Sequence, residues 1–469
     1  MREEPPNDFP MNASFPNPIA FSTSRRDFLK SSALAAGALA LARATASTAA
    51  NSRLRLALIG VGQRGKAGLT ALDREEIVAF CDVDFARGRD AVAADRNSRA
   101  SLARFPQAKW FHDYRLMFEQ MADQIDAVVV CVPDFMHFPI AMTAIRYGKH
   151  LYVEKPLCRC LTEVRTLCAA AAKAGVVTQM GNQGRTAEGI RLAREWVQAG
   201  LLGQIHTVHA WSNGGTTAFY SHDWPQPELA PETPPATLRY DLWQGVAPER
   251  PYRRLRSHQQ WRGCVDYGTG RLGDWACHQM DAAFYALDLD APLSIEPATT
   301  APKAETFPVL NTLEYRFAAR GNRGPITVKW FDGAITPPRP VEGFTFRPEG
   351  GSIFYGDKGA MWVASHSGSA RLLPESRMKE LSDSLPPKTI PRVVGGSHVE
   401  WADAIRAGKR SGSDFAIAAP LVETALLGVA AIRAQSRLEW DATTGRVTNL
   451  ASANRFVGPG YDYRPGWGV

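Results

Sequence analysis

The glycine-rich turn at residues 60–65, Gly-Val-Gly-Gln-Arg-Gly, constrains the fold of this chain more than any other feature of the sequence. It follows a mainly apolar run at 54–59 that predicts a buried strand, and a helical segment begins directly after it. A Gly-x-Gly-x-x-Gly motif between a strand and a helix is typical of the turn that binds a dinucleotide pyrophosphate. Gly60 permits the tight turn, Gly62 lets the phosphates approach the backbone, and Gly65 lets the helix pack closely.

An acidic residue lies where such a site needs one. The second predicted strand, at 77–84, contains Asp82, 22 residues after Gly60. A carboxylate there accepts a hydrogen bond from a ribose 2′-hydroxyl and repels a 2′-phosphate, so NAD is favoured as the cofactor and NADP is possible. Gln63 and Arg64, inside the turn, are also expected to contact the cofactor. A glycine turn of some other α/β fold is the alternative interpretation.

Strand-like and helix-like segments alternate up to about residue 180. Further strands are predicted at 126–133, 150–156 and 176–183, and helices at 86–95, 111–120, 137–147 and 161–174. Such alternation indicates βαβ units and a parallel sheet. We therefore expect a doubly wound Rossmann domain over residues 51–180.

The pattern changes after residue 180. A helix at 187–199 precedes an alternating strand at 204–213, and a proline-rich stretch at 223–253 is expected to form an ordered loop over a site. Further strands are predicted at 312–319, 326–333, 351–357, 359–365 and 370–375, and two helices at 397–407 and 416–434. Short strands separated by turn residues predict an open, mainly antiparallel sheet, so residues 181–469 are expected to form an α+β domain.

A lysine ends one of the predicted parallel strands, in the sequence Glu154-Lys155-Pro156. Ligands of open α/β sheets bind beyond the carboxyl ends of the strands, so Lys155 is expected to point into the cofactor cleft, with Glu154 beside it. A surface lysine before a proline turn is the alternative.

An aspartate and a histidine lie four residues apart in a predicted helix. Asp274 and His278 share a helix face, and Asp281 is expected one turn further along it. A histidine beside a carboxylate suits removal of a proton from an alcohol. The alternative is a capping aspartate and a core histidine, and no metal site is predicted because further ligands are lacking.

The first fifty residues have the parts of a twin-arginine export signal. Arg25 and Arg26 precede an apolar stretch at 33–42 and small residues at 44–46. The apolar stretch is shorter than the roughly 20 residues that a membrane-spanning helix needs, so no membrane anchor is expected. We expect a signal peptide at 1–50 and a periplasmic or secreted protein; a buried helix or an anchor are the alternatives.

The charge pattern argues against a nucleic-acid partner. The formal net charge is +7, and the basic residues are scattered rather than grouped in runs. Nucleic-acid-binding proteins instead cluster Lys and Arg on one face or in a tail. The seven cysteines match no zinc spacing, and no disulfide framework is expected.

Together these segments resemble the glucose–fructose oxidoreductase/inositol dehydrogenase (Gfo/Idh/MocA) family. The likeness is carried by GVGQRG at 60–65, CDVD at 81–84, VPDFMH at 132–137, EKP at 154–156, GNQGR at 181–185 and D-x-x-x-H at 274–278. The stretches at 240–252 and 261–281 look like an exported sub-group of that family. Val132, where many relatives have threonine, is a departure that puts one cofactor hydrogen bond in doubt.

The resemblance assigns roles to individual residues. It implies that Lys155, Asp274 and His278 are the catalytic set beside the nicotinamide. It also implies cofactor contacts for a second group of residues: Pro133, His137, Asn182 and Gln183. The outer face of the second sheet often forms oligomer contacts in this family, so a homo-oligomer is expected.

The resemblance also implies an activity. The expected protein is an NAD(P)-dependent oxidoreductase that acts on a CH–OH group of a sugar or polyol. Its cofactor is expected to be tightly bound, because an exported enzyme meets no free nicotinamide pool. A redox-assisted glycoside hydrolase or epimerase that uses bound NAD is the alternative, and a non-catalytic protein that binds sugar or NAD is a lesser one.

Overall fold

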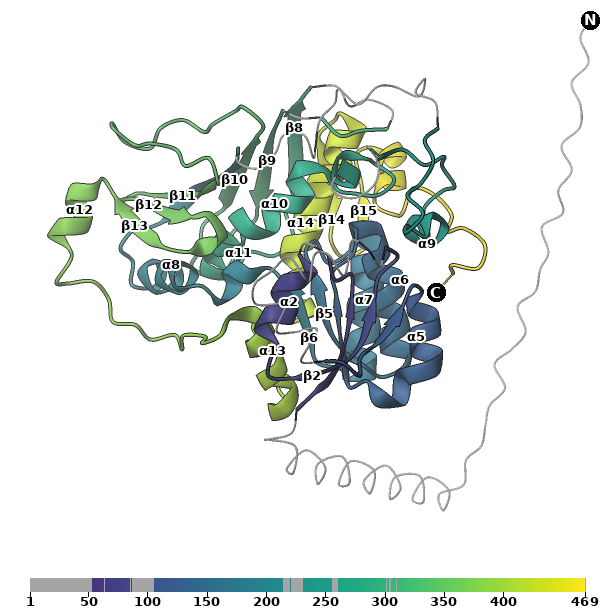
Figure 1. The fold of residues 1–469 in the computed structure, drawn as a ribbon. Helices are drawn as coiled ribbons and strands as arrows, with labels where there is room; N and C mark the ends of the chain where they lie inside the picture. The colour runs from purple at the N-terminus through teal and green to yellow at the C-terminus, as the bar shows by residue number, and fades with distance from the viewer. Residues whose placement is uncertain are drawn as a thin grey trace, which may run out of the picture. The chain divides into compact units, whose positions relative to one another are not determined.

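The computed structural model describes residues 53–468 apart from 63, 85, 87–104, 214–219, 221–230, 255–259, 301, 303, 304 and 309. The predicted signal peptide, Gln63 and nearly all of the predicted helix at 86–95 lie outside the described residues. The chain from residue 53 onward forms one compact unit, which is drawn in colour in Figure 1.

A six-stranded parallel sheet forms the first half of this unit. Its strands are β1 (Arg55–Ile59), β2 (Glu76–Cys81), β3 (Lys109–Phe111), β4 (Ala127–Val130), β5 (His150–Glu154) and β6 (Thr178–Gly181). The spatial order is β3-β2-β1-β4-β5-β6, and all five neighbouring pairs are parallel. This order is that of the dinucleotide-binding fold, whose ligand cleft opens where the order reverses between β1 and β4. The predicted Rossmann sheet is confirmed.

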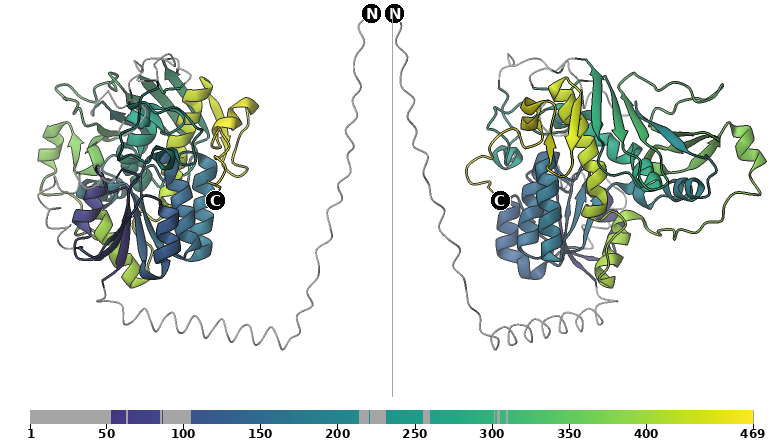
Figure 2. Two further views of the ribbon diagram at one scale, coloured as in Figure 1. Left: turned by 45° about the vertical axis from the view of Figure 1, so that its right-hand side comes forward. Right: turned by 180° about the vertical axis from the view of Figure 1, so that it is seen from behind.

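Helices cover both faces of the parallel sheet (Figure 1 and Figure 2). One face carries α5 (Tyr114–Met121), α6 (Asp134–Arg146) and α7 (Leu161–Ala174), and the other carries α2 (Gly65–Ala71) and α13 (Gly396–Ala407). Because both faces are covered, the strands are apolar along their whole length, as in the fully buried Ala127–Val130.

Helix α13 comes from the region that the sequence assigns to the second domain, yet it packs on the first sheet. Trp401 is fully buried in the same hydrophobic cluster as Leu56 and Val129 of that sheet. Tyr152 of β5 stacks on His398, and its hydroxyl shares a 3.0 Å hydrogen bond with Ser397. The first sheet is therefore completed by residues far downstream of position 180.

A nine-stranded mixed sheet forms the second half. Its strands, in spatial order, are β13 (Ala370–Leu373), β12 (Gly359–Ala364), β11 (Gly351–Gly356), β7 (Ile205–Ser212), β10 (Ile326–Asp332), β9 (Asn311–Phe317), β8 (Ser294–Thr299), β14 (Leu438–Asp441) and β15 (Arg446–Val447). Only the β7–β10 pair among these strands is parallel. The predicted, mainly antiparallel sheet is confirmed; β8, β14 and β15 are additional strands that the sequence pattern does not reveal.

The remaining helices pack between and around the sheets. They are α8 (Glu188–Gln198), α9 (Tyr240–Gln244), α10 (Gly270–Gln279), α11 (Asp281–Leu287), α12 (Glu375–Glu380) and α14 (Phe415–Ala434). Helix α14 packs against α10 and α7, and among the described residues it alone is long and apolar enough to cross a membrane. Most of α14 is buried inside the protein, as in the core helix of a folded domain.

Candidate active site

The glycine turn has the geometry that a bound pyrophosphate requires. Gly60 has a φ of +79°, and a Cβ atom there would lie 2.3 Å from the carbonyl oxygen of Cys131. A Cβ atom on Gly65 would lie 2.1 Å from the carbonyl oxygen of Gly60, so this glycine lets α2 begin against the turn. A Cβ atom on Gly62 would meet nothing within 4 Å. The turn is therefore closed on the protein side and open on the side where phosphates would approach.

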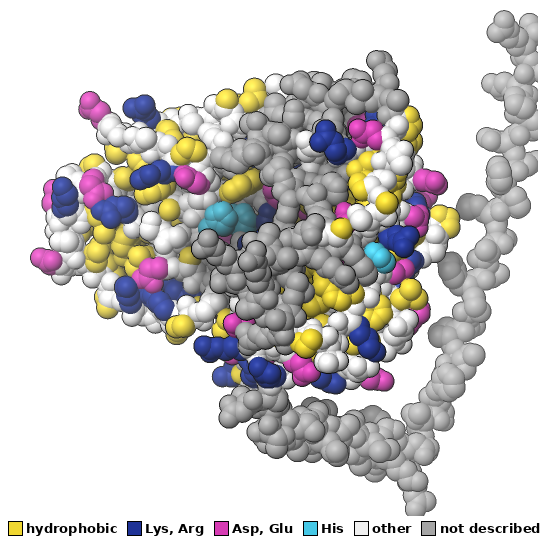
Figure 3. Space-filling model, viewed as in Figure 1, with side chains coloured by type: hydrophobic (Ala, Val, Ile, Leu, Met, Phe, Trp, Pro, Cys, Tyr) yellow, Lys and Arg dark blue, Asp and Glu magenta, His cyan; other side chains and the backbone are white. Residues whose placement is uncertain are grey.

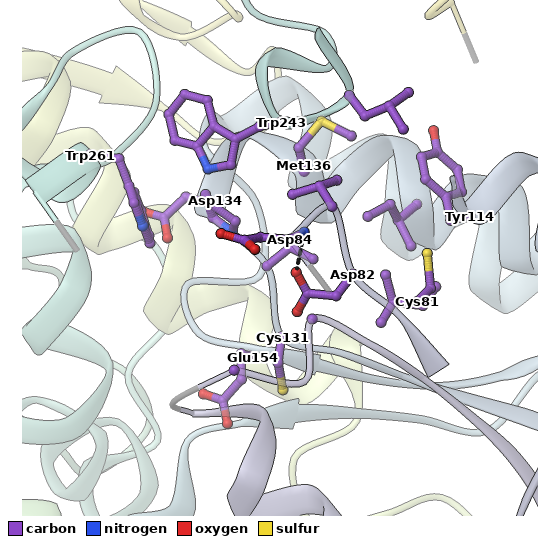
Figure 4. Close-up of a pocket in the computed structure, with 18 of the residues that line it drawn as sticks. Cys81, Asp82, Asp84, Tyr114, Cys131, Asp134, Met136, Glu154, Trp243 and Trp261 are labelled. Carbon is purple, nitrogen blue, oxygen red and sulfur yellow. Dashed lines mark hydrogen bonds between the residues drawn. The ribbon is translucent and has the colours of Figure 1, made fainter. Parts of the chain in front are cut away.

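Asp82 follows β2 and is hydrogen-bonded to the turn. Its carboxylate accepts the N–H of Val61 at 3.0 Å. It also accepts the N–H of Asp84 at 3.0 Å (Figure 4). Burial raises the pKa of Asp82. Each carboxylate oxygen has a further lone pair, so the group can also accept a hydrogen bond from a ribose hydroxyl.

A cavity of about 240 Å³ begins at this turn and runs along the carboxyl ends of the strands (Figure 4). The predicted site residues that line it are Gly60, Gly62, Arg64, Asp82, Pro133, Glu154, Lys155 and Asp274. These residues lie at the end of a parallel strand or in the loops after the strands, except Asp274, which lies on α10. The cavity therefore joins the predicted cofactor site to one end of the predicted catalytic set.

The described part of the proline-rich stretch, residues 231–253, covers this cavity, as the sequence predicts. The N–H of Arg239 donates to the carbonyl oxygen of Val83 at 2.9 Å, and Leu238 forms a β-bridge with Asp84. Leu238, together with Trp243 on α9, lines the cavity. The stretch thus closes over the end of β2, where an adenosine would lie in this fold.

The C-terminal tail packs against the loop that covers the cavity. Trp467 also lines the cavity, and the guanidinium of Arg115 lies 3.9 Å from the centroid of its ring. Arg464 donates to the carbonyl oxygen of Gly245 at 2.8 Å, just after α9. The dinucleotide cleft is therefore enclosed by two segments outside the parallel sheet.

Lys155 and Asp274 meet at the inner end of the cavity. The ammonium of Lys155 donates to the carbonyl oxygen of Asp274 at 2.8 Å and forms an ion pair with its carboxylate. The hydroxyl of Tyr220 donates to the other carboxylate oxygen, and Nε of Arg262 lies 3.4 Å from it. Burial alone would raise the pKa of Asp274, but the charges of Lys155 and Arg262 hold it well below its usual value. Asp274 is therefore a permanent anion that fixes the lysine.

His278 lies one turn along α10 from Asp274 and outside the lining of that cavity. It is buried, and its Nδ1 atom has no hydrogen-bond partner among the described residues. Burial and the nearby charge of Lys155 lower the pKa of His278 well below its usual value, so the ring is neutral and can accept a proton. An unpartnered buried nitrogen fits a group that receives its hydrogen bond from a substrate.

Basic and histidine side chains gather at a hollow in one face of the molecule. Figure 3 shows histidine side chains at this hollow with charged side chains deeper in it. The ring of His366, from the segment between β12 and β13, lies 4.1 Å from that of His278. The second sheet thus contributes a residue next to the predicted catalytic set.

Three predicted cofactor residues form one polar chain at the ends of β1, β5 and β6. Nε of Arg64 donates to Glu154 at 2.8 Å, and the amide of Gln183 donates to Glu154 at 3.3 Å and to the carbonyl oxygen of Gly181 at 2.5 Å. Arg64 and Glu154 line the cavity, whereas Gln183 is not among its lining residues. Contact between Gln183 and a cofactor stays a prediction.

His137 and Asn182 have other partners for their side chains. The two ring nitrogens of His137 face the carbonyl oxygens of Val132 at 2.9 Å and Pro156 at 2.7 Å, and burial lowers the pKa of this histidine to about 4. The ring ties the loop after β4 to the loop after β5, and so positions Lys155. Asn182 is fully buried and bonds Asp281 at 2.9 Å. Direct cofactor contacts of these two side chains stay predictions.

Asp281 is not part of the helix that carries Asp274 and His278, contrary to the sequence-based expectation of one continuous helix. Helix α10 ends at Gln279, and Asp281 begins α11. Its carboxylate is fully buried in an ion pair with Arg185 at 2.6 Å. Asp281 is therefore paired with Arg185 and Asn182, whereas Lys155 is paired with Asp274.

Sequence reasoning missed several polar groups of the site. Asp134 begins α6, accepts a 2.7 Å hydrogen bond from Thr269, and lines the cavity. Burial and the nearby charge of Asp274 raise the pKa of Asp134 to about 7. Asp134 follows Pro133 in a stretch that the family resemblance includes, so its place could have been found. His366 has no such signal, because Ser-His-Ser matches no pattern of strand, helix or ligand spacing.

Within the described residues, no group of three or more His, Cys, Asp or Glu side chains is arranged to hold a metal ion. The residues that line the cavity nevertheless have the chemistry that a dinucleotide site needs. The turn has an open face at Gly62, a carboxylate stands at the ribose position, and the strand ends form the walls.

Known proteins resemble this chain over parts of its length. A protein of Solibacter usitatus described as a glycosyl hydrolase family 109 protein is 31% identical over 219 residues, which is 43% of this chain and 46% of that protein. The D-glucoside 3-dehydrogenase of Escherichia coli is 30% identical over 164 residues, covering 34% of this chain and 43% of that protein. The chain thus matches less than half of the length of these curated relatives.

Solved structures share the fold. The crystal structure of an oxidoreductase domain protein from Kribbella flavida aligns with a TM-score of 0.55 at 21% identity, covering 83% of this chain and 99% of that one.

Two family models match consecutive parts of the chain. Residues 54–182 match the model described as an oxidoreductase family with an NAD-binding Rossmann fold. Residues 187–322 match the model of the C-terminal alpha/beta domain of the same family. The expected NAD-binding domain is confirmed at the level of the family: this chain belongs to the Gfo/Idh/MocA family of oxidoreductases.

Proposed function

We propose that this protein is an NAD-dependent oxidoreductase that acts on a CH–OH group of a sugar or polyol and keeps its cofactor bound. The contact between Lys155 and Asp274 carries the proposal. It places a paired ammonium at the inner end of the cavity that begins at the dinucleotide turn. The name of the E. coli relative, a D-glucoside 3-dehydrogenase, supports a sugar as substrate.

The chain's own residues can move the proton that such a reaction releases. The nicotinamide, when bound, supplies the acceptor or donor of hydride. His278 is neutral and takes the hydroxyl proton, a step that typically contributes about 10²- to 10⁴-fold to the rate. The ammonium of Lys155 stabilises the developing alkoxide, and Asp274 holds that ammonium in place.

The residues at the turn would hold the dinucleotide. Gly60, Gly62 and the first turn of α2 receive the pyrophosphate, and Asp82 accepts a ribose hydroxyl. The carboxylate would repel a 2′-phosphate, which supports NAD over NADP. The cover formed by residues 238–243 and by Trp467 supports slow release of the cofactor.

The predicted leader fits an enzyme of this kind. We infer export to the periplasm or beyond by the twin-arginine route, which carries folded proteins and so suits a cofactor inserted before export. A membrane-impermeable biotin reagent applied to intact cells, with detection of this protein among the labelled species, tests the location. Labelling only after the cells are lysed would contradict export.

We also infer a homo-oligomer that uses the outer face of the mixed sheet. His209, Phe331 and Tyr355 form a half-buried aromatic group on its central strands, with ring centroids 4.8–5.4 Å apart. Half-buried aromatic residues are enriched in protein–protein interfaces. Light scattering of the purified protein measures the assembly, and a monomer at all concentrations would contradict it.

A redox-neutral reaction is the second candidate. Relatives described as glycosyl hydrolase family 109 proteins support it, as does the second histidine beside His278. Transient oxidation at C3 of a glycoside acidifies the proton at C2 and permits loss of the group at C1. The net reaction then needs no free cofactor.

One experiment separates these candidates. The purified protein is incubated with a panel of glycosides without added NAD, while released aglycone and the absorbance of reduced nicotinamide are both followed. Reduction of bound cofactor without cleavage supports the oxidoreductase, and release of aglycone supports the hydrolase. A protein that contains no nicotinamide dinucleotide and binds none when it is added would overturn both.

A further inference from the structure

A second histidine lies against the predicted catalytic histidine. His366 lies in the 3-10 segment η6 (Ser365–Ser367), which links β12 to β13. Its ring centroid lies 4.1 Å from that of His278, and the two rings are inclined by 31°. The indole of Trp275 packs edge-on against both rings, at 5.9 Å from His278 and 5.7 Å from His366.

The backbone holds His366 in this position. His366 and Ser367 have φ angles of +53° and +52°, in the left-handed region that side chains other than glycine rarely adopt. The carbonyl oxygen of His366 lies so close to Gly184 that a Cβ atom there would be 2.6 Å from it. Backbone held in such a conformation is concentrated at functional sites.

Hydrogen bonds also fix which ring nitrogen is free to react. The amide of Gln279, at the end of α10, donates to Oγ of Ser365 at 2.8 Å. The same Oγ atom lies 2.9 Å from Nδ1 of His366. Because Nδ1 is engaged, Nε2 is the atom of His366 that can exchange a proton with a substrate.

The surrounding charges keep both rings neutral. Burial and then the charges of Lys155 and Arg64 lower the pKa of His366, and burial, Lys155 and His366 itself lower that of His278. Two imidazoles this close do not both become positively charged imidazolium ions, because like charges repel strongly at short range. The pair can therefore take up one proton at a time, at either of two positions.

We propose that His366 is a second proton-transfer residue of this site, which removes the carbon-bound proton next to a sugar carbonyl while His278 serves the hydroxyl group. The inference rests on the proposed function, because the oxidised sugar is the substrate of this step. His366 would be the residue that a redox-neutral reaction needs in addition to Lys155, Asp274 and His278.

The step balances without an oxidant or a reductant. In a 3-oxo glycoside, the C2–H bond breaks and its proton passes to Nε2 of His366. The bonding electron pair forms a C2–C3 double bond, and the negative charge moves to the oxygen on C3, where the ammonium of Lys155 stabilises it. A proton delivered from solvent to the other face inverts C2. Alternatively, the C3 carbonyl re-forms, the electron pair between C2 and C3 becomes a C1–C2 double bond, and the C1–O bond breaks. The electrons of that bond leave with the oxygen of the group at C1, which takes up a proton from solvent.

The exchange of this proton with solvent tests the proposal. The whole protein, as purified with its cofactor, is incubated in D₂O with methyl 3-oxo-β-D-glucopyranoside, and the loss of the C2–H signal is followed by proton NMR. We expect the parent protein to accelerate exchange over a blank without protein. His366→Asn, which keeps a polar atom near Ser365 but has no Nε2, is expected to lower the exchange rate by about 10²-fold or more.

Reduction of the bound cofactor by the parent glycoside is the second readout. His366→Asn is expected to lower this reduction far less than it lowers the exchange, whereas His278→Asn is expected to abolish the reduction and keep the exchange. His206→Asn, at an exposed position at the start of β7, is the matched control and is expected to change neither. Unchanged thermal unfolding of each variant shows that it is folded.

Three results would overturn the proposal: exchange in His366→Asn at the parent rate, equal loss of exchange and cofactor reduction in that variant, or no acceleration by the parent. The proposed function fails separately, if the parent binds no nicotinamide dinucleotide and no sugar reduces it. The probe is already oxidised, so its exchange is measured whether or not the cofactor turns over.

Discussion

The ammonium of Lys155 contacts both the backbone carbonyl and the carboxylate of Asp274, although the two residues are 119 positions apart in the chain. Lys155 follows the last residue of β5, and Asp274 lies in the middle of α10. This contact joins the parallel sheet to the helix that carries His278. The spacing of the catalytic set therefore depends on how the two halves pack.

Removal of the lysine tests that contact. Lys155→Ala is expected to lower kcat by about 10²- to 10³-fold, because the alkoxide loses its nearest cation. It should also lower Tm, because the buried carboxylate of Asp274 loses one partner. Lys173→Ala, at an exposed position near the end of α7, is the control. Full activity in Lys155→Ala would contradict the assigned role.

Two glycines of the turn are expected to respond differently to the same change. Gly60→Ala places a methyl group 2.3 Å from a backbone oxygen at a φ of +79°, so we expect a lower Tm together with loss of cofactor. Gly62→Ala has open space for its methyl group, so the Tm should stay near that of the parent while the cofactor content falls. Differential scanning fluorimetry and mass analysis of the bound cofactor give the two readouts. Equal cofactor content in Gly62→Ala and parent would place the phosphates elsewhere.

The buried carboxyl of Asp134 predicts a pH-dependent stability. Its folded pKa of about 7 lies above the ordinary value of 3.8, so the folded state binds this proton more tightly than the unfolded state does. The stabilisation from the bound proton is complete below pH 3.8 and is lost as the pH rises toward 7. Asp134→Asn imitates the protonated form and accepts the same hydrogen bond from Thr269.

Asp134→Asn should therefore raise Tm relative to the parent at pH 8, and the difference should shrink toward pH 5. Each unit of pKa shift corresponds to about 1.4 kcal/mol, so an increase of a few degrees is expected. Thermal unfolding from pH 5 to pH 8 measures it. A difference in Tm that does not change with pH would show that this carboxyl does not titrate in the range.

The C-terminal tail should control how long the cofactor stays bound. Trp467 lines the cavity and stacks under Arg115, so Trp467→Ala opens one wall of the cover. We expect this variant to lose its cofactor several-fold faster during dialysis, followed by nicotinamide fluorescence. Leu293→Ala, at a half-exposed position in the second domain, should retain it as the parent does. Equal retention in both variants would assign the closure to residues 238–243 alone.

The parallel sheet could be predicted because the sequences of its strands are continuous apolar runs that are followed by glycine, aspartate or lysine. One side of the site could also be predicted from these residues, which are Gly60, Asp82 and Lys155. The carboxyl ends of parallel strands meet at a common edge of the sheet. Asp274 and His278 could be predicted as a pair from their helical spacing. The prediction that this pair lies near Lys155 came from the family resemblance, because no local sequence pattern indicates it.

Other parts depend on contacts that no local pattern records. His366 contacts His278 because the segment between β12 and β13 packs next to α10. Gly184 has no side chain, so its loop can lie close to this segment. The ion pair of Asp281 with Arg185 joins distant segments of the chain, and the helical spacing of Asp281 does not reveal it. The edge strands β14 and β15 are only four and two residues long, too short for a periodic signal.

The packing of α13 on the first sheet also sets the order in which this protein can mature. Leu56 and Val129 are made early in synthesis, but Trp401, which belongs to the same hydrophobic cluster, is made when more than four-fifths of the chain already exists. The nucleotide-binding half cannot reach its final form on the ribosome before that point. A chain interrupted upstream of Gly396 would expose an apolar sheet face and would be a target for chaperones and proteases rather than a smaller working enzyme.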